Sequence, residues 1–216
     1  MFVGRRMTRN LITVTPDTSI LKAKNLLKQY NIEQVPVVEG RTLVGIITDR
    51  DIRENSASPA STLSIHELNY LLSEMKVGEI MTKRLYTVSP GTTIEDAVVL
   101  INEKRVNALP VVVGTELVGI ITTCDMLNVL LEVMGVGTPS ARVELTLSSS
   151  MGEIGKIASI VNGMGLTIIS IVSSISRDKE NRRTTVIRVN SDDSAELCRK
   201  FEEAGYAVTT EYRVEK

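Results

Sequence analysis

The strongest constraint on this chain is an internal duplication within its first 126 residues. Residues 3–52 align with residues 77–126 at a constant offset of 74, without a gap, and about 23 of the 50 positions are identical. Self-similarity at this level indicates a duplicated structural unit. A unit this small cannot bury both faces of its own sheet, so we expect the two copies to pack about a pseudo-twofold axis. Equivalent residues should then meet at two related clefts.

Each copy reads as strand, helix, strand, strand and helix. Apolar and β-branched runs predict the strands, and an apolar residue every three or four positions predicts the first helix. In the first copy these elements are a strand at Leu11–Val14, a helix with Ile20, Ala23, Leu27 and Tyr30 on one face, strands at Gln34–Val38 and Leu43–Thr48, and a helix that begins near Asp49–Asp51.

Polar residues mark where the other helices begin. Thr92 and Glu95 predict a capping box at the start of the first helix in the second copy. Asn55–Thr62 is rich in Ser, Ala and Pro and reads as a linker between the copies. Ser64 and Glu67 then predict a second capping box on an additional helix.

The candidate ligand site is the junction at which a strand leads into a helix. It reads Gly-Ile-Ile-Thr-Asp-Arg-Asp at residues 45–51 and Gly-Ile-Ile-Thr-Thr-Cys-Asp at residues 119–125. The first-turn amides and the positive end of the helix dipole point at such a junction. Thr48 adds a hydroxyl, and Asp51 adds a carboxylate that can accept from both hydroxyls of a ribose.

Neighbouring residues fit the same interpretation, and a plainer one also exists. Gly45 would let another chain or a ligand come close to the strand, and Arg50 and Arg53 are candidate phosphate partners. The Thr-x-x-Asp pattern equally predicts a simple helix cap. A duplicated cap would duplicate just as well, so these residues leave both alternatives open.

Residues 1–135 as a whole resemble a tandem pair of cystathionine-β-synthase (CBS) domains, a Bateman module. The resemblance rests on Met-Thr near the start of each copy, Thr-Val-x-Pro, Pro-Val-Val and Gly-Ile-Ile-Thr-x-x-Asp. It implies an α/β fold that binds an adenine nucleotide between the copies as a regulatory ligand: AMP, ADP, ATP or S-adenosylmethionine. The motif Asp would hold the ribose, the motif Thr would lie near the phosphates, and the first strand and the proline-containing strand would frame the base.

Carried over residue by residue, and with Arg50 added, the resemblance implies a defined set of binding positions. They are Ile12, Thr13, Val35, Pro36, Thr48, Arg50 and Asp51 in the first copy, and Tyr86, Thr87, Leu109, Pro110, Thr122 and Asp125 in the second. The copies differ where phosphates would lie, because Arg50 is replaced by Cys124. Loss of the arginine predicts unequal affinity for highly charged ligands. We expect Cys124 to be a small packed side chain rather than a reactive thiol.

The last third of the chain predicts a separate fold. Gly135–Ser140 is a natural boundary, and the order βαββαβ that follows is that of a ferredoxin-like fold. The expected elements are a strand at Arg142–Leu147, a helix with Ile154, Ile157, Ile160 and Val161 on one face, strands at Leu166–Ser174 and Thr184–Val189, a helix at Asp192–Ala204 and a strand at Tyr206–Tyr212.

This segment resembles an ACT domain, through the Gly-x-Ile-x-x-Ile of residues 152–157 and the Gly-Leu-x-Ile of residues 165–168. The resemblance implies a ligand loop before the first helix, made of Ser149, Ser150, Met151 and Gly152. Met151 stands where that family usually has proline. The plainer interpretation of the serines is a polar loop and helix cap.

We therefore predict two CBS domains at residues 1–62 and 63–135, and an ACT domain at residues 141–216. This order resembles the acetoin-utilization protein B family, which implies a link to acetoin or related carbon metabolism. Both domain families usually self-associate, so the resemblance also implies a homodimer, with a partner enzyme as the receiver of the signal. The alternative function is a ligand-free scaffold in which the Thr-x-x-Asp motifs only cap helices.

Composition argues against other function classes. The net charge is −1, with 25 basic and 26 acidic residues, and only 3% of residues are aromatic, so we expect no nucleic-acid or membrane partner. The sequence has no nucleophile–base pair and no metal-ligand cluster, and its single histidine, His66, has no assigned role; we expect neither catalysis nor a metal. The two cysteines are far apart and no apolar run could span a bilayer, which favours the cytoplasm.

Overall fold

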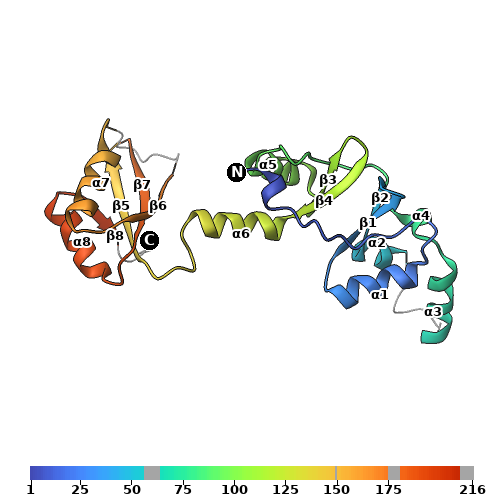
Figure 1. Ribbon diagram of the computed structural model, residues 1–216. Helices are drawn as coiled ribbons and strands as arrows, with labels where there is room; N and C mark the ends of the chain where they lie inside the picture. The colour runs from blue at the N-terminus through green and yellow to red at the C-terminus, as the bar shows by residue number, and fades with distance from the viewer. Residues whose placement is uncertain (56–63, 149, 175–180, 210–216) are drawn as a thin grey trace. The chain divides into compact units, whose positions relative to one another are not determined.

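The computed structural model describes residues 1–55, 64–148, 150–174 and 181–209 (Figure 1). The chain divides into two compact parts, Met1–Met126, called here the repeat unit, and Leu127–Lys216, called the C-terminal unit. Each has its own four-stranded antiparallel sheet. They are described separately below.

The two copies fold into equivalent elements. The first contains a 3-10 helix at Val3–Arg5, then α1 (Ile20–Tyr30), β1 (Gln34–Glu39), β2 (Thr42–Thr48) and α2 (Asp49–Glu54). The second is preceded by α3 (Ile65–Glu74) and contains α4 (Val77–Ile80), α5 (Ile94–Lys104), β3 (Ala108–Val113), β4 (Glu116–Thr122) and α6 (Thr123–Val133). The two hairpins and the Ser64–Glu67 capping box of α3 confirm the sequence prediction.

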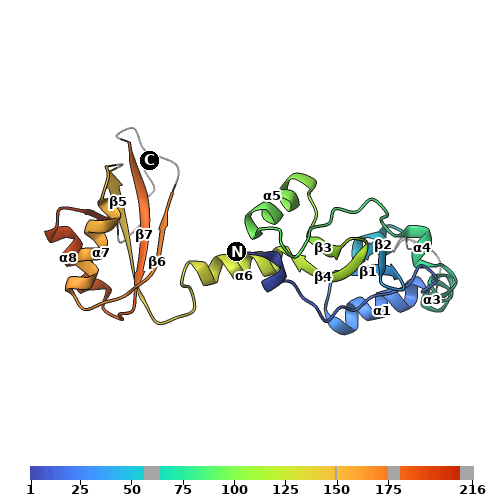
Figure 2. The ribbon, with the colours of Figure 1, turned by 45° about the horizontal axis from the view of Figure 1, so that its top comes forward.

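The two hairpins meet in one sheet of order β1-β2-β4-β3 (Figure 2). Their contact is centred on Thr42 and Glu116, which are themselves equivalent residues, 74 positions apart. Leu43 N donates to Thr115 O at 3.1 Å, and Leu117 N donates to Arg41 O at 3.0 Å. This pair of matched bonds places the expected pseudo-twofold axis at the centre of the sheet.

The opening segment of each copy packs on the other copy. Thr8 exchanges two backbone hydrogen bonds with Ile120, at 2.9 and 3.0 Å, and Thr82 exchanges two with Ile46, at 3.1 and 2.9 Å. The glycines of the two motifs allow this approach: a Cβ on Gly119 would lie 2.5 Å from Met7 Sδ, and one on Gly45 would clash with Met81 Sδ. The close approach expected at Gly45 is thus made by another segment of the same chain.

The predicted first strand of each copy, Leu11–Val14 in the first, is wrong. Only Val14 pairs, through Val14 N to Pro36 O at 3.1 Å and Val38 N to Val14 O at 2.8 Å. A longer parallel ladder would need an N–H at position 36, which proline lacks. Val88 and Pro110 repeat the arrangement in the second copy.

Two helix details also differ from expectation. The N-cap of α5 is Thr93, whose hydroxyl accepts from Asp96 N, so the predicted Thr92–Glu95 box is one residue out of register. Thr92 instead bonds Ser89 in the preceding turn. On α1, Ile20, Ala23 and Leu27 are buried as predicted, but Tyr30 is 50% exposed because it is the last residue of the helix, beyond its core contacts.

The C-terminal unit has the predicted order βαββαβ. Its elements are β5 (Ala141–Ser148), α7 (Glu153–Gly163), β6 (Ile168–Ser173), β7 (Arg182–Val189), α8 (Ser194–Glu203) and β8 (Ala207–Thr209), with sheet order β6-β7-β5-β8. The predicted final strand to Tyr212 extends beyond the described residues.

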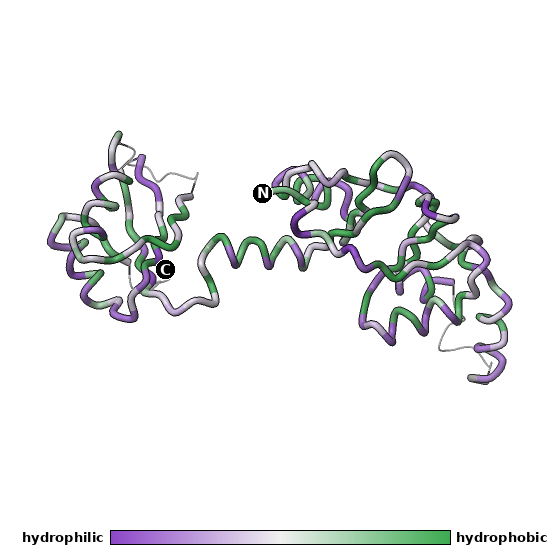
Figure 3. The backbone as a smooth tube through the Cα atoms, in the orientation of Figure 1, coloured by the Kyte–Doolittle hydropathy of each residue, from purple (hydrophilic) through white to green (hydrophobic). Residues whose placement is uncertain are grey.

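Both helices of the C-terminal unit cover the same face of its sheet (Figures 1 and 2). Leu145, Ile157, Leu197 and Phe201 are fully buried between the two layers. Ile154, predicted on the core face, is 58% exposed, because it lies on the first turn of α7, outside the contact with the sheet. Figure 3 shows turns of α1 and α6 alternating between hydrophobic and hydrophilic residues, the pattern of amphipathic helices.

Candidate functional site

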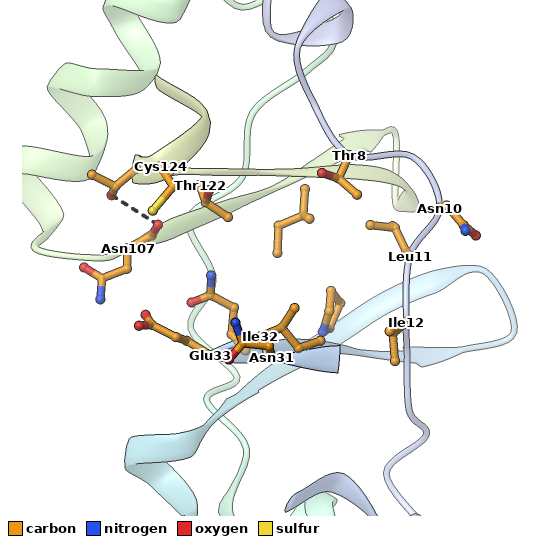
Figure 4. Close-up of a pocket in the computed structure, with 14 residues that line it drawn as sticks. Thr8, Asn10, Leu11, Ile12, Asn31, Ile32, Glu33, Asn107, Thr122 and Cys124 are labelled. Carbon is orange, nitrogen blue, oxygen red and sulfur yellow. Dashed lines mark hydrogen bonds between the residues drawn. The ribbon is translucent and has the colours of Figure 1, made fainter. Parts of the chain in front are cut away.

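An open cavity of about 540 Å³ lies inside the repeat unit (Figure 4). This volume falls in the range of small-molecule sites, roughly 300–1,000 Å³. Both copies contribute to its wall. The lining residues are Thr8, Asn10, Leu11, Ile12, Asn31, Ile32, Glu33, Gln34 and Pro36 from one side, and Asn107, Ile120, Thr122, Thr123 and Cys124 from the other.

The two sides of the cavity differ in chemistry. The first copy supplies most of its apolar wall, including Leu11, Ile12 and Ile32. The second copy supplies Thr122 and Thr123, the polar junction between β4 and α6. In Figure 4 the side chains of Leu11 and Ile12 lie on one side of the cavity and that of Thr122 lies on the other. The cavity therefore combines the predicted base-framing positions of one copy with the predicted motif of the other.

The motif at the polar end forms a helix cap. Thr122 N and Thr122 Oγ1 both donate to Asp125 Oδ2 at 2.8 Å, and Asp125 N donates to Thr122 Oγ1 at 3.2 Å. The first copy repeats this with Thr48 and Asp51, at 2.8, 2.7 and 3.1 Å. The capping interpretation of the pattern is thus confirmed in both copies.

The cap uses one oxygen of each carboxylate. Among the described residues, Asp125 Oδ1 accepts no hydrogen bond, and the side chain is half-buried. Asp125 does not itself line the cavity, but it is bonded to Thr122, which does. Capping therefore leaves an acceptor next to the polar end of the cavity.

The remaining predicted positions separate into three groups. Ile12, Pro36 and Thr122 line the same cavity. Val35 and Leu109 are fully buried in the core, so only their main chain could face a ligand, and Thr13 and Thr87 are exposed outside the cavity lining. The others do not line this cavity; they are Thr48, Arg50, Asp51, Tyr86 and Pro110.

Cys124 contradicts the expectation of a packed side chain. It is exposed and lines the cavity, while Met126 and Val129 on the same helix are buried. The first turn of α6 therefore presents position 124 to the cavity. A ligand in this cavity would therefore contact Cys124, whereas a ligand at the equivalent position of the first copy would contact Arg50.

Sequence reasoning missed the asparagines of the site. Asn31 ends α1 in the left-handed conformation, with φ of 51°, and lines the cavity. Asn107 accepts through its backbone oxygen from Thr123 N at 3.0 Å and from Thr123 Oγ1 at 3.2 Å (Figure 4). Asparagine is common at the residue that ends a helix, so the sequence could have indicated the position of Asn31. That Asn31 faces the second copy across a cavity could be known only from the tertiary structure.

A smaller cavity, of about 150 Å³, adjoins the predicted loop of the C-terminal unit. Ser150, Gly152 and Arg183 line it, Met151 is 99% exposed and does not, and Ser149 lies outside the described residues. Glu153, also lining it, accepts from Lys156 at 2.8 Å, Ser150 at 2.9 Å and Tyr206 at 3.1 Å. The hydrogen bond from Lys156 is the largest cause of a lowered pKa of Glu153, followed by that from Ser150.

Two further properties of the described residues concern metal binding and the crossing of a membrane. Within the described ranges, no three His, Cys, Asp or Glu side chains are grouped to hold a metal ion. No helix in the same part of the chain combines the length and apolarity needed to cross a bilayer.

Comparison with known proteins assigns the repeat. The CBS domain family matches twice, at residues 3–58 and 77–132, which together are more than half of the chain. The CBS domain-containing protein YhcV of Bacillus subtilis is 32% identical over 120 residues, 56% of this chain and 79% of YhcV. Several inosine-5'-monophosphate dehydrogenases also match, and the chain spans 22% to 40% of their length.

Two solved structures resemble the repeat. A proposed acetoin utilization protein (AcuB) from Vibrio cholerae superposes with a TM-score of 0.53 and 26% identity, over 62% of this chain and 93% of that protein. CBSX2, solved in complex with AMP, gives a TM-score of 0.50 and 34% identity over 60% of this chain and 96% of CBSX2. With two family matches in register with the observed duplication, the chain belongs to the CBS-domain family.

Proposed function

We propose that this protein is a non-catalytic regulator whose repeat unit binds an adenosine-containing ligand, such as AMP, ADP, ATP or S-adenosylmethionine, in the cavity between the copies. The observation that carries the proposal is the cavity itself: it is apolar on one side, and on the other it is lined by Thr122, whose cap partner Asp125 keeps one free carboxylate oxygen. The AMP complex of CBSX2 supports the choice of ligand class.

The wall chemistry suggests how such a ligand would lie. The apolar side chains of Leu11, Ile12 and Ile32 would pack on the base. A phosphate would lie at the N-terminus of the eleven-residue α6, beside Thr122 and Thr123, where the helix dipole favours negative charge. Asp125 Oδ1 would accept from the ribose hydroxyls. A second, equivalent site would be formed by the residues 74 positions away from those of the cavity, namely Thr48, Asp51, Tyr86 and Pro110.

Regulation follows from the shared wall. A ligand that touches both copies stabilises the packing in which the cavity is formed, relative to any packing in which it is not. We propose that this preference is passed to a partner enzyme or to the C-terminal unit. Self-association as a dimer, action in the cytoplasm and the domain limits 1–62, 63–135 and 141–216 remain predictions.

A ligand-free scaffold stays a second candidate function, because the Thr–Asp motifs do cap helices in both copies. A pair of variants separates the two roles. Asp125→Asn keeps an oxygen for the cap but removes the charge and one acceptor, whereas Asp125→Ala removes the free acceptor and both hydrogen bonds that the carboxylate makes in the cap. Ligand binding predicts that both lose AMP binding while only the alanine variant loses stability. A scaffold predicts that neither variant changes nucleotide binding, because none exists.

The first test is thermal unfolding of the intact chain with AMP, ADP, ATP and S-adenosylmethionine. A ligand at about 100 times its Kd adds roughly 2.7 kcal/mol to the free energy of unfolding. Raised melting temperature with at least one of these compounds is expected. Unchanged melting across the whole set, up to millimolar concentration, would leave the scaffold as the function.

For the C-terminal unit we propose an ACT-type role: sensing a small molecule at Ser150, Gly152 and Arg183, or mediating assembly. The guanidinium of Arg183 on the cavity wall would suit a carboxylate-bearing ligand such as an amino acid. The likeness to the AcuB structure supports a setting in acetoin or related carbon metabolism as part of this proposal. Melting with a panel of amino acids, against an Arg183→Ala control, tests the sensing role, and sedimentation tests assembly.

A further inference from the structure

We propose that the repeat unit has two ligand sites of different charge. The described cavity would take adenosine compounds of low charge, and the equivalent site, reached by the 74-residue shift, would take adenosine di- and triphosphates. This inference rests on the proposed function and assigns a ligand class to each site.

The backbone justifies the shift. Thr123 N donates to Asn107 O at 3.0 Å beside the cavity, and Asp49 N donates to Glu33 O at the same distance on the equivalent side. The crossed segment contacts and the caps are matched in the same way. Residues 74 positions apart therefore hold equivalent places around the pseudo-twofold axis.

Three neutral cavity residues become arginine under this shift. Asn10 corresponds to Arg84, Asn31 to Arg105, and Cys124 to Arg50.

One change opposes these, because Thr123 corresponds to Asp49. Asp49 is already paired with Arg53 at 2.9 Å, which limits its effect on a ligand. Glu33 and Asn107 exchange places under the shift, so they contribute the same charge to both sites. Arg50 is likewise paired with Glu54, at 2.7 Å. Among the residues that the structure describes, the two additional unpaired positive charges of the arginine-rich site are therefore those of Arg84 and Arg105.

Two cations lie beside Tyr86, the side chain that would meet the ligand. Tyr86 corresponds to Ile12 on the cavity wall. The guanidinium of Arg84 lies 6.0 Å from the centre of the Tyr86 ring, and Lys104 Nζ lies 5.5 Å from it. Among the described residues, Arg84 and Arg105 form no ion pair with a carboxylate. Both are exposed, so their donors are free to bind phosphate oxygens.

Arg105 is held in a costly conformation. It ends α5 with φ of 53°, in the left-handed region, as Asn31 does at the end of α1. Asparagine tolerates this region far better than a long side chain does. Folding would thus favour asparagine at position 105, and the arginine there points to a role other than folding.

The test exchanges charges between the two sites. The variant R84N/R105N/R50C gives the arginine-rich site the residues of the cavity, and the matched variant N10R/N31R/C124R does the reverse. Calorimetric titration of the intact chain uses adenosine and the sodium salts of AMP and ATP, without magnesium, at two ionic strengths. Arg105→Asn alone is the folding control, because relief of the left-handed strain should raise its melting temperature by about 2–4 °C.

The expected result is that R84N/R105N/R50C weakens ATP binding about tenfold or more, and removes most of its dependence on salt, while AMP binding at the cavity is retained. N10R/N31R/C124R should strengthen ATP binding at the cavity. An unchanged ratio of ATP to AMP affinity in both variants would overturn the charge assignment and leave the proposed function standing. No binding of any of the three compounds to the wild-type chain would overturn both.

Discussion

The two copies of the repeat share a backbone but not a surface. Their Thr–Asp caps agree within 0.1 Å in every bond, at 2.8, 2.7 and 3.1 Å in one and 2.8, 2.8 and 3.2 Å in the other. At the positions that line the cavity, however, the second copy has Arg84 and Arg105 where the first has Asn10 and Asn31. The parts that fold the chain are thus the same twice, and the parts that would face a ligand differ.

The largest stability effect is expected where the opening segments cross. Gly45→Val and Gly119→Val each force a side chain into Met81 or Met7, and each should lower the free energy of unfolding by about 1–3 kcal/mol. Denaturant unfolding measures both, and similar losses would confirm that the copies are equivalent there. Gly91→Ala is the control, since its new Cβ would meet only Ser89 Oγ at 3.7 Å. A normal melting curve for either valine variant would contradict the crossed packing.

Removing the carboxylate of either cap should lower stability equally but should affect the binding of different nucleotides. Asp51→Ala and Asp125→Ala should each cost about 1 kcal/mol, because each removes the same two hydrogen bonds to the carboxylate. Titration with AMP and ATP separates their functions: Asp125→Ala should mainly reduce AMP binding, and Asp51→Ala mainly ATP binding. Losses that do not depend on the nucleotide would remove the distinction between the sites.

The helix ends give a smaller effect of opposite sign. Asn31→Arg places a long side chain at a φ of 51° and should lower the free energy of unfolding by about 1 kcal/mol, whereas Arg105→Asn should raise it by a similar amount. Urea unfolding at low and high salt measures the change and separates strain from charge repulsion, since only repulsion is screened. Two changes of the same sign would show that the helix ends are not equivalent.

The smallest effect is expected on α3, which lies outside the duplicated residues. The backbone hydrogen bond from Ser64 is the main cause of a lowered pKa of Glu67. A carboxyl whose folded-state pKa is lowered adds stability above its unfolded value, and that stability is lost as the pH falls through the folded value. Glu67→Gln should therefore flatten the stability profile slightly on the acid side of neutrality. An unchanged acid limb would mean that the box is not formed in solution.

Local patterns predicted what depends on near neighbours. The hairpins at Gln34–Glu39 and Thr42–Thr48, the Ser64 cap and the βαββαβ order all follow from periodicity and capping residues close in sequence. The strand at Leu11–Val14 failed because its pairing depends on a proline in the neighbouring strand, 22 residues beyond Val14. The prediction that Ile154 is buried failed because helical periodicity shows which face of a helix is apolar, but not how much of that face contacts the sheet.

The sequence predicted which residues could bind a ligand, but not which of them lie together in one cavity. Thr122, Ile12 and Pro36 were expected as binding positions, and the structure brings them to one cavity although they come from different copies. No local pattern reports that crossing, because it depends on contacts between segments more than 100 residues apart, such as Thr8 and Ile120. Cys124 was misjudged because the first turn of α6 presents it to the cavity, while Met126 and Val129 on the same helix are buried.

Titration of the wild-type chain with AMP, compared with its 2',3'-dideoxy form, is the most direct measurement of sugar recognition by the motif carboxylates. Saturable binding of AMP that weakens at least tenfold without the two hydroxyls is the predicted result, because Asp125 Oδ1 then has no donor to bind. Equal binding of both compounds, or no saturable binding of AMP, would contradict it.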